Sequence, residues 1–584
     1  MGRIRLFYLR FRLTPRVQVY LAWFLLVAGM LAYTLITGFE AVLRYNTFTS
    51  TAFDLGNMDQ VLWNTLHGHP FQWTNQGVDW FGPPIRLAQH FEPILLPLSL
   101  LYAFGADPRI LLIFQTLVLA SGALPIFLLS RHYLPRWPLV AGALVLGYLL
   151  SSALIGVNLF DFHPVALVTP LFLYAFLALT RRRFVWCLIC CVLAATCKEE
   201  IPFVVMLFGF LVLWKYQAPR LGLILIIGGL LYGIVAWTAI KHFYPGNQGN
   251  NFWYRYAYLG ATPTDAIVNI AMHPWILPLT YLTLERLYYL AGLLRCYGFP
   301  SLLAPEWLLP ALPNLALNLL PNNNSLLYSG IYHYNAPLIP FVAMSAIIGL
   351  ARLVAFWQQW RSEPVESVLL DEEHVLREQA RLDVLTQRLD NIRIKLLMTI
   401  AFVGRPLAFV RPGLLVVSRV RESRWRSLNE RLIDLARTIS LDRLQWIVSL
   451  WIVCMVLLNF VIMIPWFNVL RADHLPGERE QGINQLLAVI PSTASVSASG
   501  TLNPHLSERS YVTVFPLITY TDQQKNLRTV DYIVVDLNHI VPEEDKDSTV
   551  RMLNQVRNSR QFCTLKQYDG VLLLVKSDGV CSTS

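Results

Sequence analysis

A succession of long apolar segments separated by short polar turns constrains this sequence more than any other feature. Residues 17–38, 221–240 and 444–467 are each long enough to cross a bilayer as a helix, which needs about 20 apolar residues. Hydrophobic residues make up 55% of the chain and charged residues 14%, whereas soluble domains carry about 25% charged residues. The sequence therefore predicts an α-helical membrane protein that crosses the bilayer many times.

Basic residues predict the direction of each span, because loops rich in Lys and Arg stay in the cytoplasm. Five arginines precede residue 17, and Arg181, Arg182 and Arg183 form a basic turn, so we expect both regions to be cytoplasmic. About eleven spans are expected. They are residues 17–38, 110–130, 139–157, 165–180, 184–197, 201–214, 221–240, 282–297, 301–320, 336–356 and 444–467.

Changes in composition along the chain predict its domains. Residues 1–356 form a transmembrane core with an external loop at 39–93, and 444–467 is the last transmembrane helix. Residues 357–443 are highly charged and predict a cytoplasmic helical insertion, which is either a solvated segment or a docking site for a partner. Residues 468–584 lack long apolar runs and predict a small extracytoplasmic α/β domain.

The predicted C-terminal domain has no glycine pattern typical of a nucleotide site. Cys563 and Cys581 are able to form a disulfide there if the compartment is oxidising. The net charge of the chain is +10, but the basic residues lie beside apolar segments, so nucleic acid is not an expected partner. The expected strands are residues 495–499, 511–515, 531–536 and 570–576, and the expected helix is residues 549–558.

The first external loop concentrates reactive side chains. Asp54, Asp59 and Gln60 lie near its start, and His90 and Glu92 lie near its end. A carboxylate can act as a general base on a hydroxyl, and a histidine can carry a proton or bind an anion. This composition predicts a reactive site at a membrane surface.

A simpler interpretation exists for residues 58–71. Their apolar side chains fall at helical spacing, and aromatic residues accompany them. Such a segment is also typical of an amphipathic helix that lies in the headgroup region as an anchor only.

The outer ends of other predicted spans also carry polar groups. Ionisable groups near membrane depth are costly and usually mark a site or a pathway. A helix cap or a self-neutralising helix end would explain each group alone, but a shared substrate-binding site explains their occurrence on one side of the membrane. The predicted binding residues are Gln60, His90, Glu92, Asp161, His163, Lys198, Glu199, Glu200, Tyr332 and His333.

No cofactor is firmly predicted, and a divalent metal ion remains an open alternative. Carboxylate oxygens and imidazole nitrogens both coordinate such ions. His90 with Glu92, and Asp161 with His163, are two positions apart, and such pairs converge on one ion only in extended or loop backbone. The candidate ligands are Asp54, His90, Glu92, Asp161 and His163.

Specific motifs run along nearly the whole chain outside residues 357–443. They are DLGNMDQVLWNTLHGHPF, QHFEPILLPLSLLY, NLFDFHPVAL, KEEIPF, LLAPEWLLPALPNLALNLL, HYNAPLIPF and SVSASGTLNPHLSER. In these motifs the chain resembles the uncharacterised bacterial and archaeal membrane-protein family called domain of unknown function 2079. That family is similar to the GT-C superfamily of integral-membrane glycosyltransferases, which take a sugar from a polyprenyl-phosphate donor.

The resemblance implies a GT-C-like fold in the plasma membrane, with a cytoplasmic N-terminus and an extracytoplasmic C-terminus. It places Asp54, in the DLG motif after the first span, at the position of the catalytic carboxylate, with Asp59 as the alternative. It implies that Lys198 and Glu199 correspond to a Lys/Glu pair near the donor phosphate. The implied function is sugar transfer to an unknown acceptor outside the membrane.

Two other functions remain open from the residues. A transporter or flippase for a lipid-linked or anionic solute would use the same charged groups without forming a bond. Transport needs a site near the midplane that is reachable from both sides, however, whereas the predicted groups collect at one face. A non-catalytic membrane scaffold is the third alternative, and it predicts that the Asp54 region tolerates loss of charge.

Overall fold

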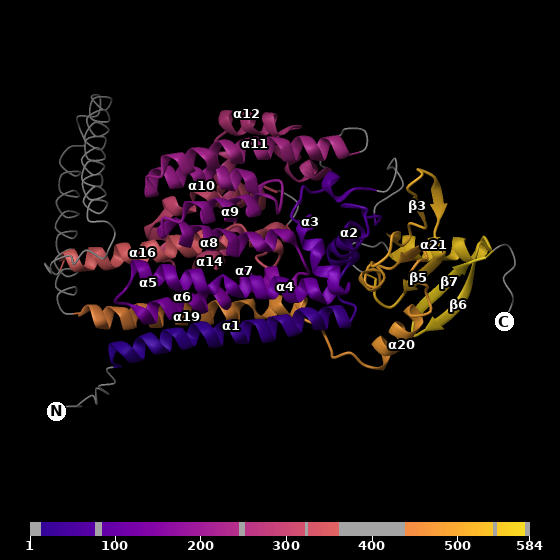
Figure 1. The fold of residues 1–584 in the computed structure, drawn as a ribbon, viewed down its shortest axis with the longest axis horizontal. Helices are drawn as coiled ribbons and strands as arrows, with labels where there is room; N and C mark the ends of the chain where they lie inside the picture. Colours follow the sequence, from indigo (N-terminus) through magenta and orange to yellow (C-terminus); the bar gives the residue numbers. More distant parts are fainter. Residues whose placement is uncertain are drawn as a thin grey trace, which may run out of the picture.

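The structure is a computed structural model that describes residues 13–75, 84–244, 251–321, 325–360, 439–540 and 546–577. Nearly all of the predicted insertion at 357–443 lies outside these residues, and so does Cys581. The described part consists of a long helix bundle with a small sheet domain at one end (Figure 1). We call this end of the bundle the sheet end.

Long apolar helices form the bundle and confirm a membrane protein with several spans. Within the described residues five helices are long and apolar enough to cross a membrane, and a sixth span results if the pair bent by 40° counts as one. The bent pair is α6 (Pro138–Leu149) with α7 (Ser152–Leu159). The five are α1 (Pro15–Asn46), α4 (Pro108–Ser121) continued by α5 (Ala123–Tyr133), α11 (Pro219–Phe243), α16 (Ile339–Trp360) and α19 (Leu441–Leu470).

The other predicted spans coincide with shorter helices. α8 (Val168–Thr180), α9 (Phe184–Ala195) and α10 (Ile201–Tyr216) are apolar but shorter than a full span. Residues 282–297 contain α14 (Leu284–Arg295), and residues 301–320 form 3₁₀ turns followed by α15 (Leu312–Leu319). The multi-span helical class is thus confirmed, and the number eleven stays a prediction.

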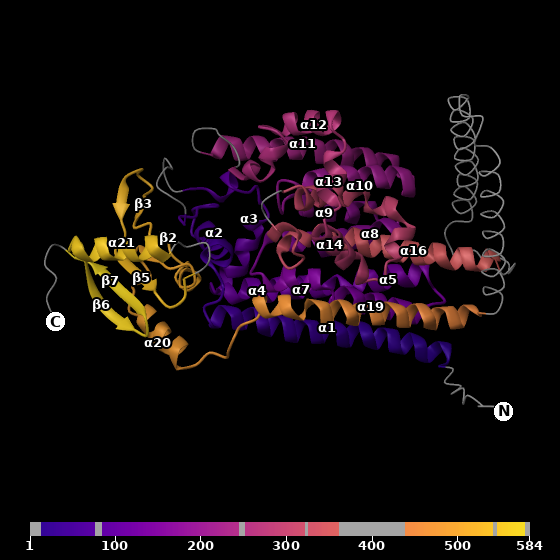
Figure 2. The same ribbon diagram turned by 180° about the vertical axis from the view of Figure 1, so that it is seen from behind.

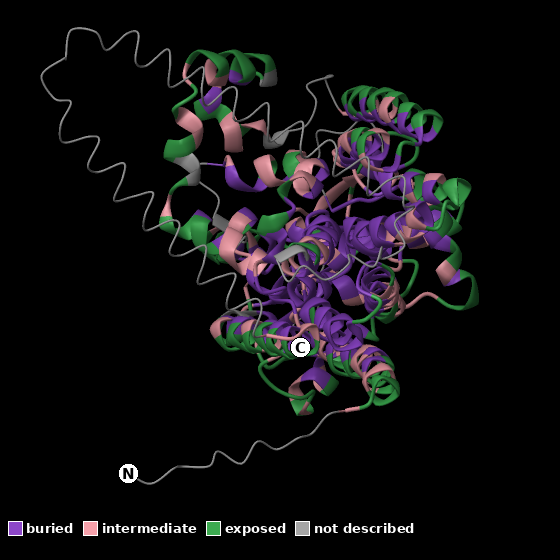
Figure 3. Ribbon diagram, turned by 90° about the vertical axis from the view of Figure 1, so that its left-hand side faces the viewer, coloured by how far each residue is buried: buried purple, intermediate pink, exposed green. Residues whose placement is uncertain are grey.

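Close helix packing and lipid-facing apolar surfaces are both visible in the bundle. α10 and α11 approach closely at Gly209, where an added Cβ would lie only 2.8 Å from the carbonyl oxygen of Gly222. The outer face of α11 leaves Ile227 and Leu231 more than half exposed. Buried residues lie at the centre of the bundle and exposed ones on its outer helices (Figure 3). This arrangement suits a bundle surrounded by lipid.

α1 and α19 lie side by side along one flank of the bundle (Figures 1 and 2). Gln445 of α19 donates a hydrogen bond to Gln18 of α1 over 2.9 Å. α19 therefore returns the chain along the first helix to the sheet end, where the C-terminal domain begins.

The segment after α1 is buried rather than spread on the membrane. α2 (Asn57–Leu66) contacts the short helices α3 (Leu95–Leu98) and η3 (Ser99–Phe104). Val61 and Leu62 are fully buried, and Gln60 bonds to main-chain carbonyls of the sheet domain. The anchor-only interpretation of residues 58–71 is therefore wrong, because protein covers most of this helix. Residues 95–104 form two short helices, α3 and η3, which are too short to span a membrane.

The C-terminal domain contains a five-stranded sheet in the order β2-β1-β5-β7-β6. β1 is parallel to β2 and β5, whereas β7 is antiparallel to β5 and β6. The four predicted strands are confirmed, but β6, α20 and a separate β3–β4 hairpin were not predicted. The strands are β1 (Val496–Ala498), β2 (Val512–Val514), β3 (Thr519–Thr521), β4 (Leu527–Thr529), β5 (Tyr532–Asp536), β6 (Phe562–Tyr568) and β7 (Val571–Lys576).

Two helices cover opposite faces of this sheet. Val534 of β5 packs in the cluster with α20 (Glu478–Leu487), and its neighbours Ile533 and Val535 pack in the cluster with α21 (Lys546–Asn558). This alternation follows from the two-residue period of a strand. α21 confirms the predicted helix at 549–558. Cys563 in β6 is disulfide-bonded.

The sheet domain docks on the C-terminal end of α1. Phe48 is 3% exposed and lies in the apolar cluster of the domain beside α20. His505 stacks on Tyr45 and Phe48, with ring centroids 4.1 and 4.0 Å apart. Arg44 donates a 2.6 Å hydrogen bond to the carbonyl of Leu470, which joins α1 to the end of α19. The segment that follows α1 is therefore held between bundle and sheet domain.

Candidate functional site

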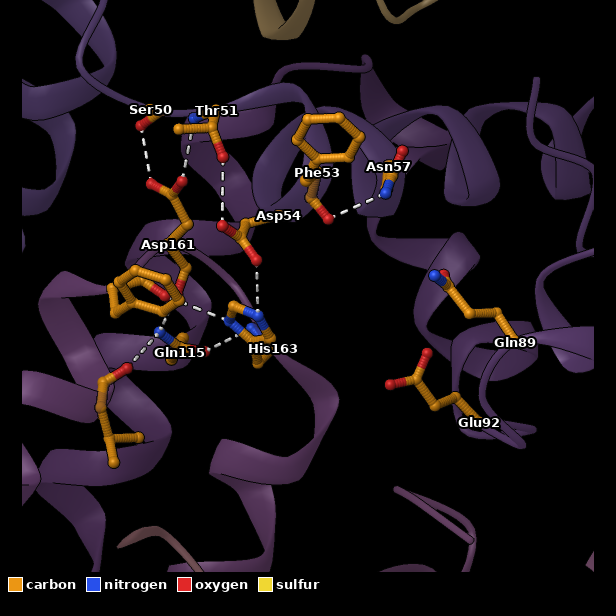
Figure 4. A network of polar contacts seen from close by, with 12 residues as sticks. Ser50, Thr51, Phe53, Asp54, Asn57, Gln89, Glu92, Gln115, Asp161 and His163 are labelled. Atoms are coloured by element: carbon orange, nitrogen blue, oxygen red, sulfur yellow. Dashed lines mark hydrogen bonds and ion pairs between the residues drawn. The ribbon is translucent and has the colours of Figure 1, made fainter. Parts of the chain in front are cut away.

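Asp54 lies in η1 (Ala52–Gly56), a single π-helical turn between α1 and α2. Such turns are rare and occur frequently at functional sites. Asp161, in the loop after α7, holds the start of this turn: its carboxylate accepts bonds from the Ser50 hydroxyl over 2.7 Å and from the Thr51 amide over 3.1 Å. Figure 4 shows the Asp161 carboxylate turned toward these two residues, while the Asp54 carboxylate lies between Thr51 and His163.

Asp54 and His163 form a pair. Oδ1 of Asp54 lies 3.1 Å from Nε2 of His163, and Oδ2 accepts a 3.1 Å bond from the Thr51 hydroxyl. Nδ1 of the same imidazole lies 3.1 Å from the carbonyl oxygen of Phe160. A carboxylate and a carbonyl both only accept, so the ring donates to Asp54 when Nε2 carries a proton and to Phe160 when Nδ1 does. The carboxylate thus lies within hydrogen-bond distance of an imidazole, an arrangement able to move a proton.

Solvent reaches this pair from one side. The Asp54 side chain is 22% exposed and that of His163 is 9% exposed. A hydroxyl group of a substrate can therefore approach Asp54 while the histidine stays covered. A partly exposed carboxylate with a buried imidazole behind it is suited to general base chemistry.

Gln115 of α4 fixes the loop that carries His163. Its Nε2 donates to the carbonyl of Asp161 over 2.8 Å, and its Oε1 accepts from the His163 amide over 3.0 Å. Asp161 has a φ of +48°, a left-handed conformation that this loop has to hold. The sequence analysis missed Gln115, although a glutamine inside the apolar segment 110–130 is a signal of a buried polar function.

The second histidine, His333, lies on the first. The rings of His163 and His333 stack with centroids 3.8 Å apart, and Tyr332 meets the nearby Phe160 edge-on at 4.4 Å. Burial, and then the neighbouring His163, hold the pKa of His333 well below its ordinary value, so His333 is neutral. Its Nδ1 is buried without a hydrogen-bond partner among the described residues. The prediction that 332–333 and 161–163 come together is therefore met by the geometry.

Lys198 lies in the turn between α9 and α10, and the ring of Tyr334 lies between it and the stacked histidines. Its Nζ is 3.2 Å from Oε1 of Glu200 and 5.7 Å from the ring centre of Tyr334, which in turn packs on His333 at 4.2 Å. Burial lowers the pKa of Lys198, but Glu200 and Glu199 outweigh it and raise the pKa above its ordinary value. The site thus keeps a charged ammonium group, which is able to bind a phosphate.

Glu199 pairs with His90 and not with its neighbour Lys198. Nδ1 of His90 lies 2.8 Å from Oε1 of Glu199, whose Oε2 accepts from the Phe91 amide over 3.1 Å. Burial, followed by Arg86 and Lys198, lowers the pKa of His90 to about 3, so its ring is neutral and donates Nδ1–H to the carboxylate. The end of the first loop is thereby fastened to the turn before α10.

Glu92 has a different partner. It accepts a 2.8 Å bond from Nε of Arg86, and both side chains are about 5% exposed or less. Arg86 also lies over the ring of Trp73 at 5.4 Å. In Figure 4, Glu92 lies apart from Asp54 and His163, with no interaction drawn to either. A buried ion pair of this kind is a structural contact, and removing one partner leaves an uncompensated charge.

Asp59 and Gln60 lie away from the Asp54 group. Asp59 is fully buried, contacts the hydroxyl of Tyr102 and accepts a 2.6 Å bond from the hydroxyl of Ser507. Burial, and then Glu508, raise the pKa of Asp59 well above its ordinary value. Gln60 exchanges two bonds with Thr74, of 2.8 and 2.9 Å. Both side chains join α2 to its surroundings.

The candidate metal ligands do not converge on a common point. In the described part of the chain no group of three or more His, Cys, Asp and Glu side chains is arranged to hold a metal ion. Asp54 faces His163, whereas Asp161 faces the start of η1, and His90 and Glu92 have the separate partners given above.

Two solved structures resemble this chain at low similarity. ArnT from Cupriavidus metallidurans, bound to undecaprenyl phosphate, has 12% sequence identity and a TM-score of 0.44, over 96% of this chain and 99% of that one. The Archaeoglobus fulgidus oligosaccharyltransferase, tethered with an acceptor peptide containing the NVT sequon, has 11% identity and a TM-score of 0.33, over 87% of this chain and 69% of that one. At these values neither structure assigns an activity to the chain.

A family model covers the residues of the site. No protein of curated function matches the chain. The family described as Predicted membrane protein (DUF2079) matches residues 44–370 and 431–573, which include Asp54, His163, Lys198, His333 and strands β1 to β6 of the sheet domain. Because these segments make up well over half of the sequence, the chain belongs to the DUF2079 family of predicted membrane proteins.

Proposed function

We propose that this protein is an integral-membrane glycosyltransferase of the GT-C type, which transfers a sugar from a polyprenyl-phosphate donor to an acceptor hydroxyl. The observation that carries the proposal is the partly exposed Asp54 paired with His163, at the same end of the bundle as the charged Lys198. The position of Asp54 in the DLG motif after the first span supports it. The basic turn at residues 181–183 supports an extracytoplasmic location for the site.

In the proposed reaction, Asp54 takes the proton of the acceptor hydroxyl. The acceptor oxygen attacks the anomeric carbon of the sugar, and the bond between that carbon and the phosphate oxygen breaks. The electron pair leaves with the polyprenyl phosphate, and because the acceptor attacks from the face opposite the phosphate, the configuration at the anomeric carbon is inverted. His163 orients the Asp54 carboxylate through the 3.1 Å contact, and its own Nδ1 contact with Phe160 fixes the ring.

Lys198 stabilises the departing phosphate. Its side chain is 13% exposed, and an ion pair in such a partly dehydrated place is stronger than in water. The phosphate competes with Glu200 for the ammonium group of Lys198. Donor binding therefore replaces the Glu200 carboxylate with the phosphate as the partner of this group. His333 contributes a neutral donor or acceptor at the centre of the stack between Asp54 and Lys198.

The test is a transfer assay with purified protein in lipid. A panel of radiolabelled polyprenyl-phosphate sugars is supplied with an extract of envelope acceptors, and wild type is compared with Asp54→Asn and with Asp473→Asn. Asp473 is exposed in the connection between α19 and α20, so its variant is a matched control. Release of polyprenyl phosphate by wild type and the control, but not by Asp54→Asn, is the expected result.

Two outcomes contradict the proposal. Full transfer by a normally folded Asp54→Asn protein shows that Asp54 is not the base. Movement of the intact labelled lipid between leaflets, without release of sugar, favours the transporter alternative instead.

A further inference from the structure

Three asparagine side chains hold the turn that carries Asp54. Nδ2 of Asn503, in the loop after β1, donates to Oδ1 of Asn75 over 2.9 Å, and Nδ2 of Asn75 lies 3.2 Å from Oδ1 of Asn503. Nδ2 of Asn75 also lies 2.7 Å from Oδ1 of Asn57, whose own Nδ2 donates to the carbonyl of Phe53 over 2.8 Å. We call Asn57, Asn75 and Asn503 the asparagine clamp. All three are 5% exposed or less.

The main chain of η1 contacts the same loop of the sheet domain at both of its ends. The amide of Ala52, at the start of the turn, donates to the carbonyl of Gly500 over 2.8 Å. At the end of the turn, a Cβ added to Gly56 would lie 2.5 Å from Oδ1 of Asn503 and 3.6 Å from Cα of Pro504. Only a glycine permits this approach. The whole turn therefore lies against residues 500–504.

The turn has a second support on its other side. Asp161 and His163, from the bundle, hold the start of the turn and the carboxylate of Asp54 (Figure 4). A π-helical turn is an irregular element that surrounding contacts have to stabilise. Its position is thus set jointly by a loop of the bundle and by a loop of the sheet domain, roughly 340 residues apart in sequence.

The clamp does not carry the docking of the sheet domain by itself. Phe48 lies in the apolar cluster beside α20, and His505 stacks between Tyr45 and Phe48. Asp59 bonds to Ser507. These contacts stay when Asn503 is changed, so we expect the domain to remain docked while η1 loses its support.

From this geometry we infer that Asn503 is a positioning residue for Asp54, and that the sheet domain is part of the catalytic unit. The inference rests on the proposed role of Asp54 as the base. Asn503 touches neither substrate nor the reacting atoms; it acts through Asn75 and the main chain at Ala52 and Gly56. A displacement of about 1 Å in a catalytic group can lower a rate on the order of 100-fold.

The first test measures kinetics in Asn503→Ala and Asn503→Asp, with Asn526→Ala as the control. Asn526 is exposed in the turn between β3 and β4. We expect both Asn503 variants to lower kcat about 10- to 100-fold with the KM for the polyprenyl-phosphate sugar unchanged, and the control to match wild type. Asn503→Asp keeps the size of the side chain and loses the donation to Asn75, so it serves if Asn503→Ala does not fold.

A double-mutant cycle separates positioning from general loosening. In a protein that already carries Asp54→Asn, Asn503→Ala should cause no further loss of the residual rate, because it acts through Asp54. If Asn503→Ala lowers the rate by the same factor in wild type and in the Asp54→Asn protein, the inference is overturned. A normal kcat in both Asn503 variants also overturns it.

The second test needs no substrate. Amide hydrogen exchange is compared between wild type, Asn503→Ala or Asn503→Asp, and Asn526→Ala in lipid. We expect faster exchange in peptides that cover residues 50–57 and unchanged exchange in β5 and β7. If wild type transfers no sugar, the proposed function fails, and the exchange result alone decides whether Asn503 positions the turn. Unchanged protection of residues 50–57 overturns the inference.

Discussion

Asp54 and Asp59 are five positions apart in the same loop, and the fold gives them opposite surroundings. The Asp54 side chain is 22% exposed and faces His163, whereas Asp59 is 0% exposed between Tyr102 and Ser507. A carboxylate must be reachable to take a proton from a substrate. Accessibility, not residue type, therefore separates the candidate base from the buried contact.

The same sheet domain produces both environments. Ser507 covers Asp59, and the loop at residues 500–504 lies against the main chain of the Asp54 turn but leaves the carboxylate open. Burial raises the pKa of Asp59, and its two carboxyl oxygens accept hydrogen bonds from Tyr102 and Ser507. This suits two hydroxyl neighbours. Asp59 thus serves to fasten the domain that positions Asp54.

The largest expected effect is on activity and separates the two carboxylates directly. Asp54→Asn should lower the transfer rate about 10²- to 10⁴-fold without changing the unfolding temperature, because it removes the general base but buries nothing new. Asp59→Asn should keep most of the activity. Parallel rate and unfolding measurements check this, with Asp473→Asn as the exposed control. A folded Asp59→Asn protein without activity would reverse the assignment of the two residues.

The next expected effect is on stability, where the change at Asp59 should matter more than the change at Asp54. Asp59→Ala should destabilise the protein by roughly 2–4 kcal/mol, because it leaves the buried hydroxyl of Tyr102 without its partner and removes one of the two bonds of the Ser507 hydroxyl, which keeps its contact with the Pro504 carbonyl. Asp54→Ala should cost far less, since its side chain is partly exposed. Unfolding of the protein in lipid, followed by temperature, measures both variants.

A combined variant sharpens this result. Replacing the polar groups together, as Asp59→Leu with Tyr102→Phe, should recover part of the stability that Asp59→Ala loses, because the Tyr102 hydroxyl is then removed with its partner and Ser507 keeps its bond to the Pro504 carbonyl. If the combined variant is as unstable as Asp59→Ala, the loss comes from packing and not from the hydroxyl groups.

The membrane character and the strands were predictable from sequence, because both depend on local pattern. The burial of α2 was not. Its residues read as an amphipathic surface helix, and the protein that covers it includes Ser507 and Arg509, which are distant in sequence. A local period indicates that a face is apolar, but it does not indicate which distant segment covers that face.

The ion-pair partners of the charged residues could not be predicted from the sequence either. Lys198 and Glu199 are neighbours in the chain, yet Lys198 pairs with Glu200 and Glu199 pairs with His90. Successive side chains leave the backbone in different directions, so adjacency does not make a pair. Asn503 was missed for a related reason: its motif is visible, but its contact with Asn75 exists only in the folded chain.

A smaller effect concerns pH and the buried carboxyl group. The pKa of Asp59 in the folded chain is raised above its value in the unfolded chain, about 3.9, so the folded state binds more protons between the two values. The stability it contributes is therefore present below about pH 4 and is lost as the pH rises through the folded pKa. The stability of wild type relative to Asp59→Asn should fall as the pH rises above about 4 and through the folded pKa of Asp59. A constant difference would mean that Asp59 is ionised in the folded protein.

The smallest expected effect is the pH dependence of stability that His505 contributes at the interface between α1 and the sheet domain. Its sign is opposite to that of Asp59. Burial lowers the pKa of His505 to about 3, whereas a histidine in the unfolded chain titrates near 6.5. As the pH falls below about 6.5 the unfolded chain binds a proton that the folded chain does not, so this contribution is present above that pH and is lost toward about pH 3. His505→Phe keeps an aromatic ring between Tyr45 and Phe48 and should lose its share of the acid sensitivity. Unfolding temperatures of wild type and variant across that range test this, and equal slopes would place a protonated histidine in the folded interface.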